Sequence, residues 1–509
     1  MATPAEKLAR SLEVLSIFQR SSGSAAIRAK DITRTHRERL VKNGFLQEVI
    51  KGWYVPSRPD GSEGESTAWY ASFWNFCSSY LEERFGELWS LSPEQSLIIH
   101  SGNLSVPQQL LVRSPKANNN LTPLPFNTSL FDVRSSIPEK PDRHQKDGLR
   151  MFSLSSAFLH SSPAFFINHP TDARTALSLI KDASDVLAAL LDGGHTVIAG
   201  RLAGAFRNIG QDRIADNILK AMQAAGYNVR ENDPFSSNLK LFVTGRDTSP
   251  YVNRVKMMWH SMREPIIGRF PEALGLPKDK ESFLKNVEEN YLTDAYNSLS
   301  IEGYMVTAEL IERVRSGGWD PDGNDKAHRD ALAARGYWQA HQAVLKSLDR
   351  ILHGQNAGQV VEDDHSEWYR QLFAPSVTLG LLKPRDLAGY RTGQVYIRNS
   401  MHVPLNQNAV RDVMPTLFEL LREEPSPAVR VVLGHFVFVY IHPYMDGNGR
   451  IGRFLMNALL ASGGYPWTVI PVERREGYMY ALEQASVGQN IIPFTDFLAN
   501  LVSKTMKGL

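Results

Sequence analysis

The stretch HFVFVYIHPYMDGNGRIGRFLMN, residues 435–457, decides how the rest of the chain is interpreted. An apolar run reaches His442, Pro443 then interrupts it, and residues 446–450 (DGNGR) form a glycine-rich loop before a second periodic segment. A glycine-rich loop that opens a helix presents backbone N–H groups and the positive end of the helix dipole to an anion. The stretch therefore predicts two helices joined by a loop that binds phosphate.

The side chains around this loop supply a base, a metal ligand and two cations. A histidine such as His442 ordinarily has a pKa near neutrality, which suits proton abstraction. Asp446 is an oxygen ligand of the kind that Mg²⁺ takes alongside phosphate oxygens. Arg450 and Arg453 stand at i and i+3, so they share one helix face and can each grip a phosphate group. An ordinary turn explains the glycines but leaves these four side chains unexplained.

The sequence HPYMDGNGRIGR resembles the signature of the Fic family, His-x-Phe-x-(Asp/Glu)-Gly-Asn-Gly-Arg-x-x-Arg, with Tyr444 where the family has Phe. The resemblance covers about residues 250–506 and implies an α-helical core that transfers AMP from Mg-ATP to a hydroxyl of a target protein. It implies His442 as the base, Asp446 as the Mg²⁺ ligand, Gly447, Asn448 and Gly449 as the phosphate cradle with Asn448 orienting the α-phosphate, Arg450 facing the leaving pyrophosphate and Arg453 facing the γ-phosphate. The implied cofactor is Mg²⁺, and ATP is the substrate.

An upstream segment, TDAYNSLSIEGYMVT, contains Ser298-x-x-x-Glu302-Gly303 and resembles the inhibitory helix motif of the same family. The resemblance implies that Glu302 pairs with Arg453 and thereby blocks the γ-phosphate position. Because the motif lies in the same chain, the inhibition would act in cis. A plain helix C-terminus is the alternative interpretation of Glu-Gly.

Two further regions match family positions. The hairpin expected over residues 390–404, GYRTGQVYIRNSMHVP with its neighbours, resembles the Fic flap, which pairs with an extended segment of the target by strand addition. Its docking residues would be Tyr390, Val395, Ile397 and His402. Asn457 and Tyr478 match positions near the adenine, where an amide can bond the base edge and a ring can stack on it. Core packing is an equally good interpretation of both.

The N-terminal residues 1–60 predict a winged helix-turn-helix. Helices are expected over 4–19, 25–32 and 33–43, followed by a hairpin of 45–50 and 53–57. Residues 1–58 hold eleven Lys or Arg and five Asp or Glu, a local net charge of +6. Four basic residues of the third helix form a candidate DNA surface: Arg34, Arg37, Arg39 and Lys42. A protein-binding adaptor is the open alternative, although the segment resembles the winged helix of AbiEi-type antitoxins.

The middle region, residues 61–235, predicts a mixed α/β domain. Strands are expected at 96–100, 109–114, 129–134 and 149–155. Helices are expected at 67–86, 171–191, 196–208 and 211–225. The Pro/Ser/Asp-rich stretch 232–250 is the predicted domain boundary.

From residue 251 to 506 the pattern is nearly all helical, apart from the hairpin over 390–404. Helices are expected at 279–300, 305–316, 325–353, 364–374, 406–422, 427–441, 450–463, 474–485 and 492–506, with the inhibitory helix at about 285–303. The predicted fold class is therefore mainly α: an all-helical core with a small β-hairpin flap, preceded by a winged helix-turn-helix and the mixed α/β domain.

Composition sets limits on the class of protein. The chain has 509 residues, 42% of them hydrophobic. Its formal net charge of +2 is too small to indicate any class of charged partner. Its one cysteine, Cys77, excludes an intrachain disulfide, and no zinc signature is present. The N-terminus has no signal-peptide core, and the longest apolar run, 431–441, is short of the ~20 residues of a membrane span. We therefore expect a cytoplasmic protein with no membrane partner.

The resemblance to Fic implies a protein adenylyltransferase that Glu302 holds inactive. Its expected partners are ATP and a protein with an acceptor hydroxyl, including the chain itself, while DNA at residues 1–58 and a homodimer are open. Three alternatives remain: removal of AMP from a modified target with Glu302 aligning water, transfer of another phosphate-linked group, and a transcriptional regulator whose C-terminal half senses nucleotide.

Overall fold

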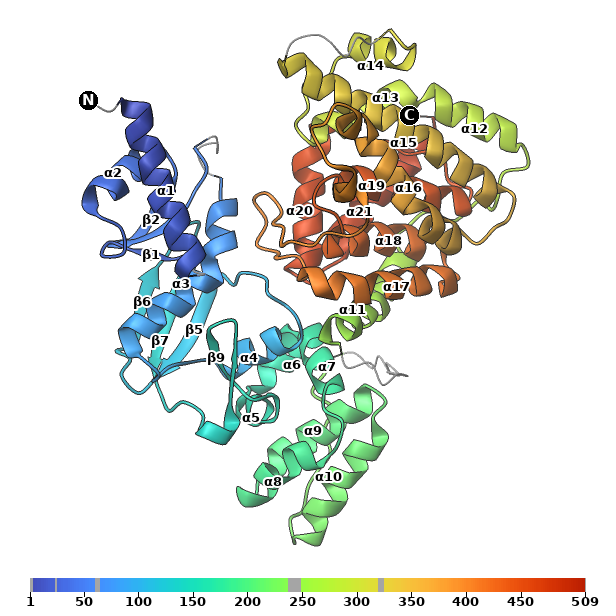
Figure 1. Cartoon of the computed structure of the whole chain (residues 1–509). Helices are drawn as coiled ribbons and strands as arrows, with labels where there is room; N and C mark the ends of the chain where they lie inside the picture. The colour runs from blue at the N-terminus through green and yellow to red at the C-terminus, as the bar shows by residue number, and fades with distance from the viewer. Residues whose placement is uncertain (1–2, 23–24, 60–64, 237–248, 319–324, 509) are drawn as a thin grey trace. The chain divides into compact units, whose positions relative to one another are not determined.

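The computed structural model describes residues 3–22, 25–59, 65–236, 249–318 and 325–508. The chain divides into two compact units (Figure 1). Unit 1 comprises Met1–Pro250 and Tyr396–Val403, and unit 2 comprises Tyr251–Val395 and Pro404–Leu509. Helices dominate the described residues, so the predicted mainly-α class is confirmed.

Unit 1 begins with two helices beside a small sheet. The elements are α1 (Pro4–Ser22), β1 (Ile27–Arg28), α2 (Arg34–Lys42), β2 (Leu46–Ile50) and β3 (Trp53–Pro56). The sheet is antiparallel in the order β1-β3-β2. The first and third predicted helices and the hairpin are confirmed, but the helix expected over 25–32 is wrong. Ile27 is fully buried and pairs with Tyr54, so tertiary pairing decides the conformation of this short segment.

A four-stranded mixed sheet follows. The elements of residues 67–152 are α3 (Thr67–Phe85), β4 (Ser90–Leu91), α4 (Pro93–His100), β5 (Gln109–Ser114), β6 (Asn120–Pro123), β7 (Ser129–Arg134), η1 (Lys140–Asp142), β8 (Arg143–Lys146) and β9 (Leu149–Phe152). Strands β8 and β9 form a separate two-stranded sheet. The strand order is β4-β5-β7-β6, and β5 runs parallel to β7. The strand expected at 96–100 is wrong, because Ser92 caps a helix there by accepting a hydrogen bond from the Gln95 N–H, with Pro93 in the first turn.

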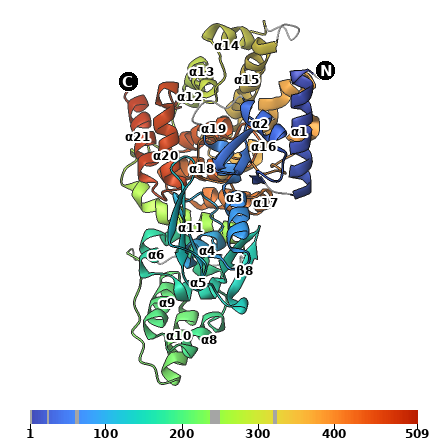
Figure 2. The ribbon, with the colours of Figure 1, turned by 90° about the vertical axis from the view of Figure 1, so that its left-hand side faces the viewer.

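Short helices complete unit 1: α5 (Leu154–His160), α6 (Pro163–Asn168), α7 (Pro170–Ser178), α8 (Ser184–Asp192), α9 (Thr196–Asn208) and α10 (Asp212–Ala224). The single helix expected at 171–191 is two, α7 and α8. Helices α9 and α10 pack side by side, as Figure 2 also shows. The predicted boundary at 232–250 lies partly outside the described residues.

Unit 2 is helical throughout its described part. Its elements are α11 (Pro250–Ile267), α12 (Lys280–Glu289), α13 (Tyr291–Ile301), α14 (Ala308–Arg315), α15 (Asp325–Leu352), α16 (Ala357–Thr378), η2 (Pro384–Leu387), α17 (Gln407–Glu423), α18 (Pro427–Ile441), α19 (Asn448–Ser462), η3 (Val472–Arg474), α20 (Arg475–Ser486) and α21 (Ile492–Met506). The helix expected at 279–300 is two, separated at Asn290. One apolar core joins these helices, with α18 buried along most of its length.

The β-hairpin expected over 390–404 is wrong: no strand forms there, and the structure describes all of these residues. Residues 396–403 instead belong to unit 1. The Val106 N–H donates to the Met401 carbonyl oxygen at 2.8 Å, and Asn399 Oδ1 accepts from the Ser66 N–H at 3.0 Å. Val403 is 8% exposed and is part of the apolar core of unit 1. The segment therefore makes hydrogen bonds and apolar contacts with the rest of unit 1, where a hairpin ladder was expected.

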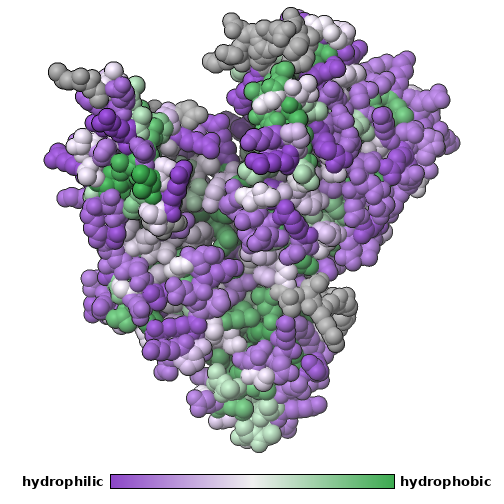
Figure 3. Space-filling view, viewed as in Figure 1, coloured by the Kyte–Doolittle hydropathy of each residue, from purple (hydrophilic) through white to green (hydrophobic). Residues whose placement is uncertain are grey.

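Among the described helices, none has both the length and the apolar character needed to cross a membrane. Large apolar side chains at the surface are scattered, as at Leu274, Met305 and Leu381. The face drawn in Figure 3 is mostly hydrophilic, with small hydrophobic areas.

Helices α15 and α16 approach each other closely at Gly336. A Cβ added at Gly336 would lie 1.9 Å from the carbonyl oxygen of Leu372. We expect Gly336→Ala to lower the free energy of unfolding by about 1–3 kcal/mol, because the two helices must separate. Thermal and denaturant unfolding measure this. Gly268→Ala is the control, since a Cβ there meets nothing within 4 Å; equal losses in both variants would contradict the packing argument.

Candidate active site

The loop between α18 and α19 is shaped by two left-handed residues and one amide. His442 ends α18 with φ 55° and ψ 61°, and Gly447 precedes α19 with φ 80°. Asn448 Oδ1 accepts from the Tyr444 N–H at 2.8 Å, and its Nδ2 donates to the Tyr444 carbonyl oxygen at 2.8 Å. The Asn448 side chain therefore closes the loop, which limits its predicted role toward an α-phosphate to the second N–H of its amide.

His442 is held as a neutral imidazole. Its Nδ1 lies 3.2 Å from the Val439 carbonyl oxygen. Because a carbonyl oxygen can only accept, Nδ1 carries the proton and the Nε2 lone pair is left for another proton. Burial lowers the pKa of His442 to about 4, because the charged form loses its hydration. The side chain can therefore accept a proton at neutral pH.

Arg453 and Glu302 form an ion pair inside unit 2. Glu302 Oε1 lies 2.7 Å from Arg453 Nη2, and Ser298 Oγ accepts from Arg453 Nε at 2.8 Å. Burial by itself would raise the pKa of Glu302, but the charges of Arg453 and Arg450 outweigh it and lower that pKa. Because a lowered pKa keeps the carboxylate ionised down to acidic pH, the contact is present near neutrality and is lost only as pH falls through that lowered value.

The Glu302 carboxylate also lies on the first turn of α19. A Cβ added at Gly449 would lie 2.2 Å from Glu302 Oε1. Gly449 is thus the residue that lets an anion reach the backbone here. A carboxylate at a helix N-terminus occupies the place that suits a phosphate group.

Arg450 and Arg453 retain buried N–H groups that can bind an anion. Arg450 is 2% exposed and lies between the rings of Tyr304 and Phe373, each 5.2 Å from its guanidinium carbon. Among the described residues, Arg450 Nε and Arg453 Nη1 are buried and have no hydrogen-bond partner. Unpaired buried donors are costly, so both point to a ligand that accepts hydrogen bonds.

Asp446 is the one acidic side chain of the loop. Its side chain is 68% exposed, its Oδ1 accepts from the Gly447 N–H at 2.6 Å, and its Oδ2 lies 3.4 Å from Arg450 Nη2. No group of three or more His, Cys, Asp or Glu gathers as a metal site in the described part of the chain. A single exposed carboxylate fits Mg²⁺, which keeps waters and takes its other ligands from substrate phosphates.

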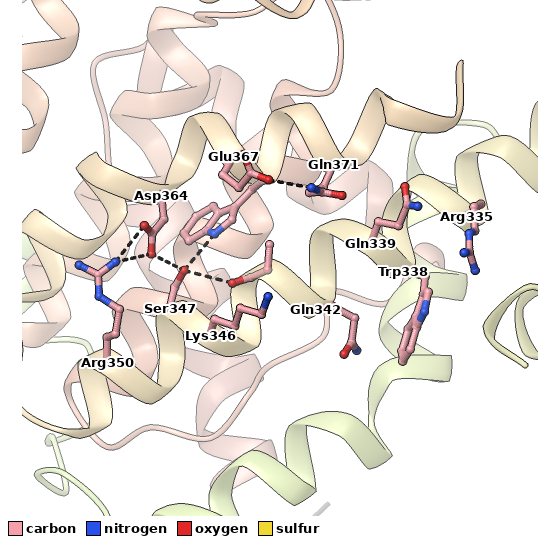
Figure 4. A pocket seen from close by; sticks show the side chains of 12 residues that line it. Arg335, Trp338, Gln339, Gln342, Lys346, Ser347, Arg350, Asp364, Glu367 and Gln371 are labelled. Atoms are coloured by element: carbon pink, nitrogen blue, oxygen red, sulfur yellow. Dashed lines mark hydrogen bonds and ion pairs between the residues drawn. The ribbon is translucent and has the colours of Figure 1, made fainter. Parts of the chain in front are cut away.

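Two cavities of unit 2 differ in the groups that line them. One of about 520 Å³ is lined by Asp446, Arg450 and Tyr304 together with apolar residues of α16. Another of about 480 Å³ lies between α15 and α16 (Figure 4). In that second cavity Arg350 faces Asp364 at 2.9 Å and Glu367 pairs with Gln371 at 2.7 Å, so these charged groups satisfy one another. The first cavity is the part of the candidate active site beside Asp446 and Arg450, while His442, Arg453 and Glu302 do not line it.

Residues 360–460 match the family described as Fic/DOC. The chain contains a Fic domain. It is 28% identical over 258 residues to the protein adenylyltransferase Fic of Nematostella vectensis, covering 50% of this chain and 56% of that protein. It is 31% identical over 241 residues to the protein of the same name from Drosophila virilis, covering 46% of each. The chain thus spans about half the length of the curated relatives it matches.

Solved structures with a Fic domain are also similar. A Fic domain containing signaling protein from Bacteroides thetaiotaomicron is 20% identical, with 50% of this chain and 94% of that chain covered and a TM-score of 0.36. Fic-1 from C. elegans is 17% identical, with 66% of this chain and 94% of that chain covered and a TM-score of 0.38.

The two residues expected near the adenine, Asn457 and Tyr478, make hydrogen bonds to other residues of unit 2. Asn457 Nδ2 donates to the Thr468 carbonyl oxygen at 3.1 Å, and its Oδ1 accepts from the Thr468 N–H at 2.8 Å. Tyr478 is 1% exposed, and its hydroxyl lies 2.7 Å from His435 Nε2. Both side chains therefore stabilise the fold in this conformation, and their contact with adenine stays a prediction.

The residues expected to dock a target are mostly buried. Val395 is 8% exposed and His402 is 3% exposed, while Ile397 is partly buried. The Tyr390 hydroxyl lies 2.9 Å from His365 Nε2. None of these side chains presents an open docking surface in this conformation, so target docking stays a prediction.

The four basic residues predicted to contact DNA divide into two pairs. Arg37 donates to the Ala29 carbonyl oxygen at 2.5 Å, and Arg39 donates to the Lys7 carbonyl oxygen at 3.0 Å. Arg34 and Lys42 are exposed. The first pair stabilises unit 1, and DNA binding stays a prediction.

Sequence reasoning missed Arg391. It is 2% exposed, and its Nε donates to the His442 carbonyl oxygen at 2.8 Å. The partners of Arg391 are backbone carbonyl groups, which the sequence does not mark. The one sequence feature that could have indicated this residue is a lone charge in the otherwise uncharged segment GYRTGQVYI.

Tyr444 offers a test of the loop's packing. Its ring stacks on Tyr369 with centroids 3.8 Å apart, and its hydroxyl is buried without a partner among the described residues. We expect Tyr444→Phe to raise the free energy of unfolding by about 1 kcal/mol, because an unsatisfied hydroxyl is removed. Tyr390→Phe, which loses the bond to His365, should lower it instead. Chemical unfolding of both variants measures the signs, and a loss in Tyr444→Phe would show that the hydroxyl has a partner.

Proposed function

We propose that the chain is a protein adenylyltransferase that transfers AMP from ATP to a Ser, Thr or Tyr hydroxyl of a protein, and that Glu302 inhibits it. The observation that carries the proposal is the anion site at the start of α19. A carboxylate of the chain itself lies there, 2.7 Å from Arg453 Nη2, while two buried arginine N–H groups beside it have no partner among the described residues. Such a site suits a nucleotide triphosphate once the carboxylate leaves.

The residues of the loop supply the steps of the transfer. The neutral His442 takes the proton of the acceptor hydroxyl through Nε2 as that oxygen forms a bond to the α-phosphorus. The bond from the α-phosphorus to the bridging oxygen breaks, and pyrophosphate leaves toward Arg450. Backbone N–H groups from Gly447 to Gly449 stabilise the charge that develops on the phosphoryl oxygens.

Asp446 would hold the divalent ion. When bound, Mg²⁺ neutralises charge on the phosphates and so assists departure of pyrophosphate. The exposed carboxylate beside Arg450 leaves room for the water ligands that this ion retains.

Inhibition follows from competition for Arg453. A charge-assisted hydrogen bond of about 1.5–3 kcal/mol shifts occupancy by about ten- to hundredfold. The Glu302 carboxylate and a γ-phosphate cannot both occupy the turn at Gly449, where the carboxylate already lies against the backbone. ATP therefore binds in a productive pose only when Glu302 moves.

Replacement of His442 tests the base. We expect His442→Ala to abolish transfer of label from α-labelled ATP, while ATP binding measured by calorimetry stays within a few-fold of the parent, because the phosphate site is intact. His353→Ala is the control, since His353 is exposed and pairs with Asp349. Persistent transfer in His442→Ala would remove His442 from the role of base.

Replacement of Glu302 tests the inhibition. We expect Glu302→Gly to raise self-labelling by about ten- to hundredfold, because Arg453 is freed for the γ-phosphate. The matched control is Glu288→Gly, an exposed glutamate in the last turn of α12. Self-labelling is followed by mass spectrometry with ATP and Mg²⁺, and equal rates in wild type and Glu302→Gly would contradict the inhibitory role.

The reverse direction is the second candidate, because Glu302 lies where it could align a water as well as block a phosphate. A protein already carrying AMP separates the two directions. Loss of AMP with wild type, but not with Glu302→Gly, would favour removal.

A further inference from the structure

Arg391 is a buried cation whose partners are carbonyl oxygens. Its Nε donates to His442 O at 2.8 Å, its Nη1 donates to Gly393 O at 2.9 Å, and its Nη2 donates to Leu405 O. Its own backbone N–H donates to Pro443 O at 2.9 Å. No acidic side chain pairs with it among the described residues, so the negative end of α18 is what balances its charge.

The contact with His442 has a conformational consequence. His442 has φ 55°, a left-handed conformation that is unfavourable for a residue with a Cβ. This backbone conformation sets the direction in which the imidazole leaves the chain. Because Arg391 bonds the carbonyl oxygen of that residue, it stabilises the conformation that aims the ring.

The other two carbonyl partners lie on either side of the segment 394–404. Gly393 precedes it and Leu405 follows it, and both belong to unit 2. One guanidinium therefore joins the base and both ends of the segment that was expected to dock the target.

We propose that Arg391 is a positioning residue, which fixes the His442 imidazole and both ends of the segment 394–404 in one arrangement. Its role is to keep the base aligned with the acceptor hydroxyl, and it touches no reacting atom. The catalytic consequence rests on the proposed function, whereas the alignment of His442 does not.

The direct test follows the ring of His442 by NMR with ¹⁵N-labelled histidine, using the full chain. The Nδ1–H signal is assigned by its absence in His442→Ala. We expect Arg391→Met to lose this signal or to exchange its proton with water at least tenfold faster. Arg411→Met should leave it unchanged, because Arg411 is exposed and its hydrogen bonds within the described part of the chain go to Tyr390 O and Gln407 O. An unchanged signal in Arg391→Met overturns the proposal.

A variant that keeps the fold guards against simple unfolding. Arg391→Lys retains the charge but cannot reach all three carbonyls, so it should show a partial loss of the signal at a melting temperature close to wild type. If Arg391→Met is not folded, Arg391→Lys decides, and a wild-type signal in it overturns the proposal.

Transfer provides the second readout, in the Glu302→Gly background with α-labelled ATP as the probe. We expect Arg391→Met or Arg391→Lys to lower the maximal rate of self-labelling, by up to about 100-fold for a misplaced base, at an unchanged ATP concentration for half-maximal rate. A changed ATP requirement with an unchanged maximal rate contradicts the proposal. If the Glu302→Gly parent transfers no label, the proposed function fails, and the NMR result still decides the role of Arg391.

Discussion

The contact between Glu302 and the start of α19 is the constraint on which the Fic domain's site depends. The N-terminus of α19 concentrates unpaired N–H groups and positive potential, and Arg453 adds a full charge one turn on. Without an anion, the positive potential at the N-terminus of α19 would repel the buried guanidinium groups of Arg450 and Arg453. A carboxylate that follows α13 satisfies it, and Gly449 provides the space, since a Cβ there would meet Glu302 Oε1 at 2.2 Å. The Glu302 carboxylate is thus held by the same physical features that suit a phosphate group.

The second constraint is the left-handed turn at the end of α18. His442 ends the helix where glycine usually does, and the turn is held from both sides. Nδ1 of the ring bonds back to Val439, and Arg391 bonds the carbonyl oxygen. Asn448 then closes the following loop through the backbone of Tyr444. The left-handed conformation of His442 is therefore stabilised by hydrogen bonds on both sides of the turn.

The sequence predicted the features whose chemistry is local. Glycines, acids and bases within a short loop have few other uses together, and Ser298-x-x-x-Glu302 places two side chains on one face of a helix. It did not predict features whose partners are distant backbone groups. Asn457 matches a position near the adenine, yet a match cannot show that its amide bonds Thr468. The segment 25–32 was expected to be helical, but pairing of Ile27 with Tyr54 decides otherwise. Arg391 was not predicted for the same reason. Every residue has a backbone carbonyl group, so the sequence does not indicate which carbonyl groups an arginine bonds.

Main-chain groups of the segment 396–403 are already bonded to other parts of unit 1. A flap that binds targets by strand addition needs unpaired main-chain groups along one edge. Here the carbonyl of Met401 already accepts from Val106, and the N–H of Asn399 donates to Thr67 Oγ1 at 3.1 Å. Val403 also lies among the buried residues of unit 1. A target strand can use these groups only after the bonds within unit 1 break, and that cost must be subtracted from the affinity of any target that docks there. Release of this segment from its partners in unit 1 would therefore be a step separate from any movement of Glu302.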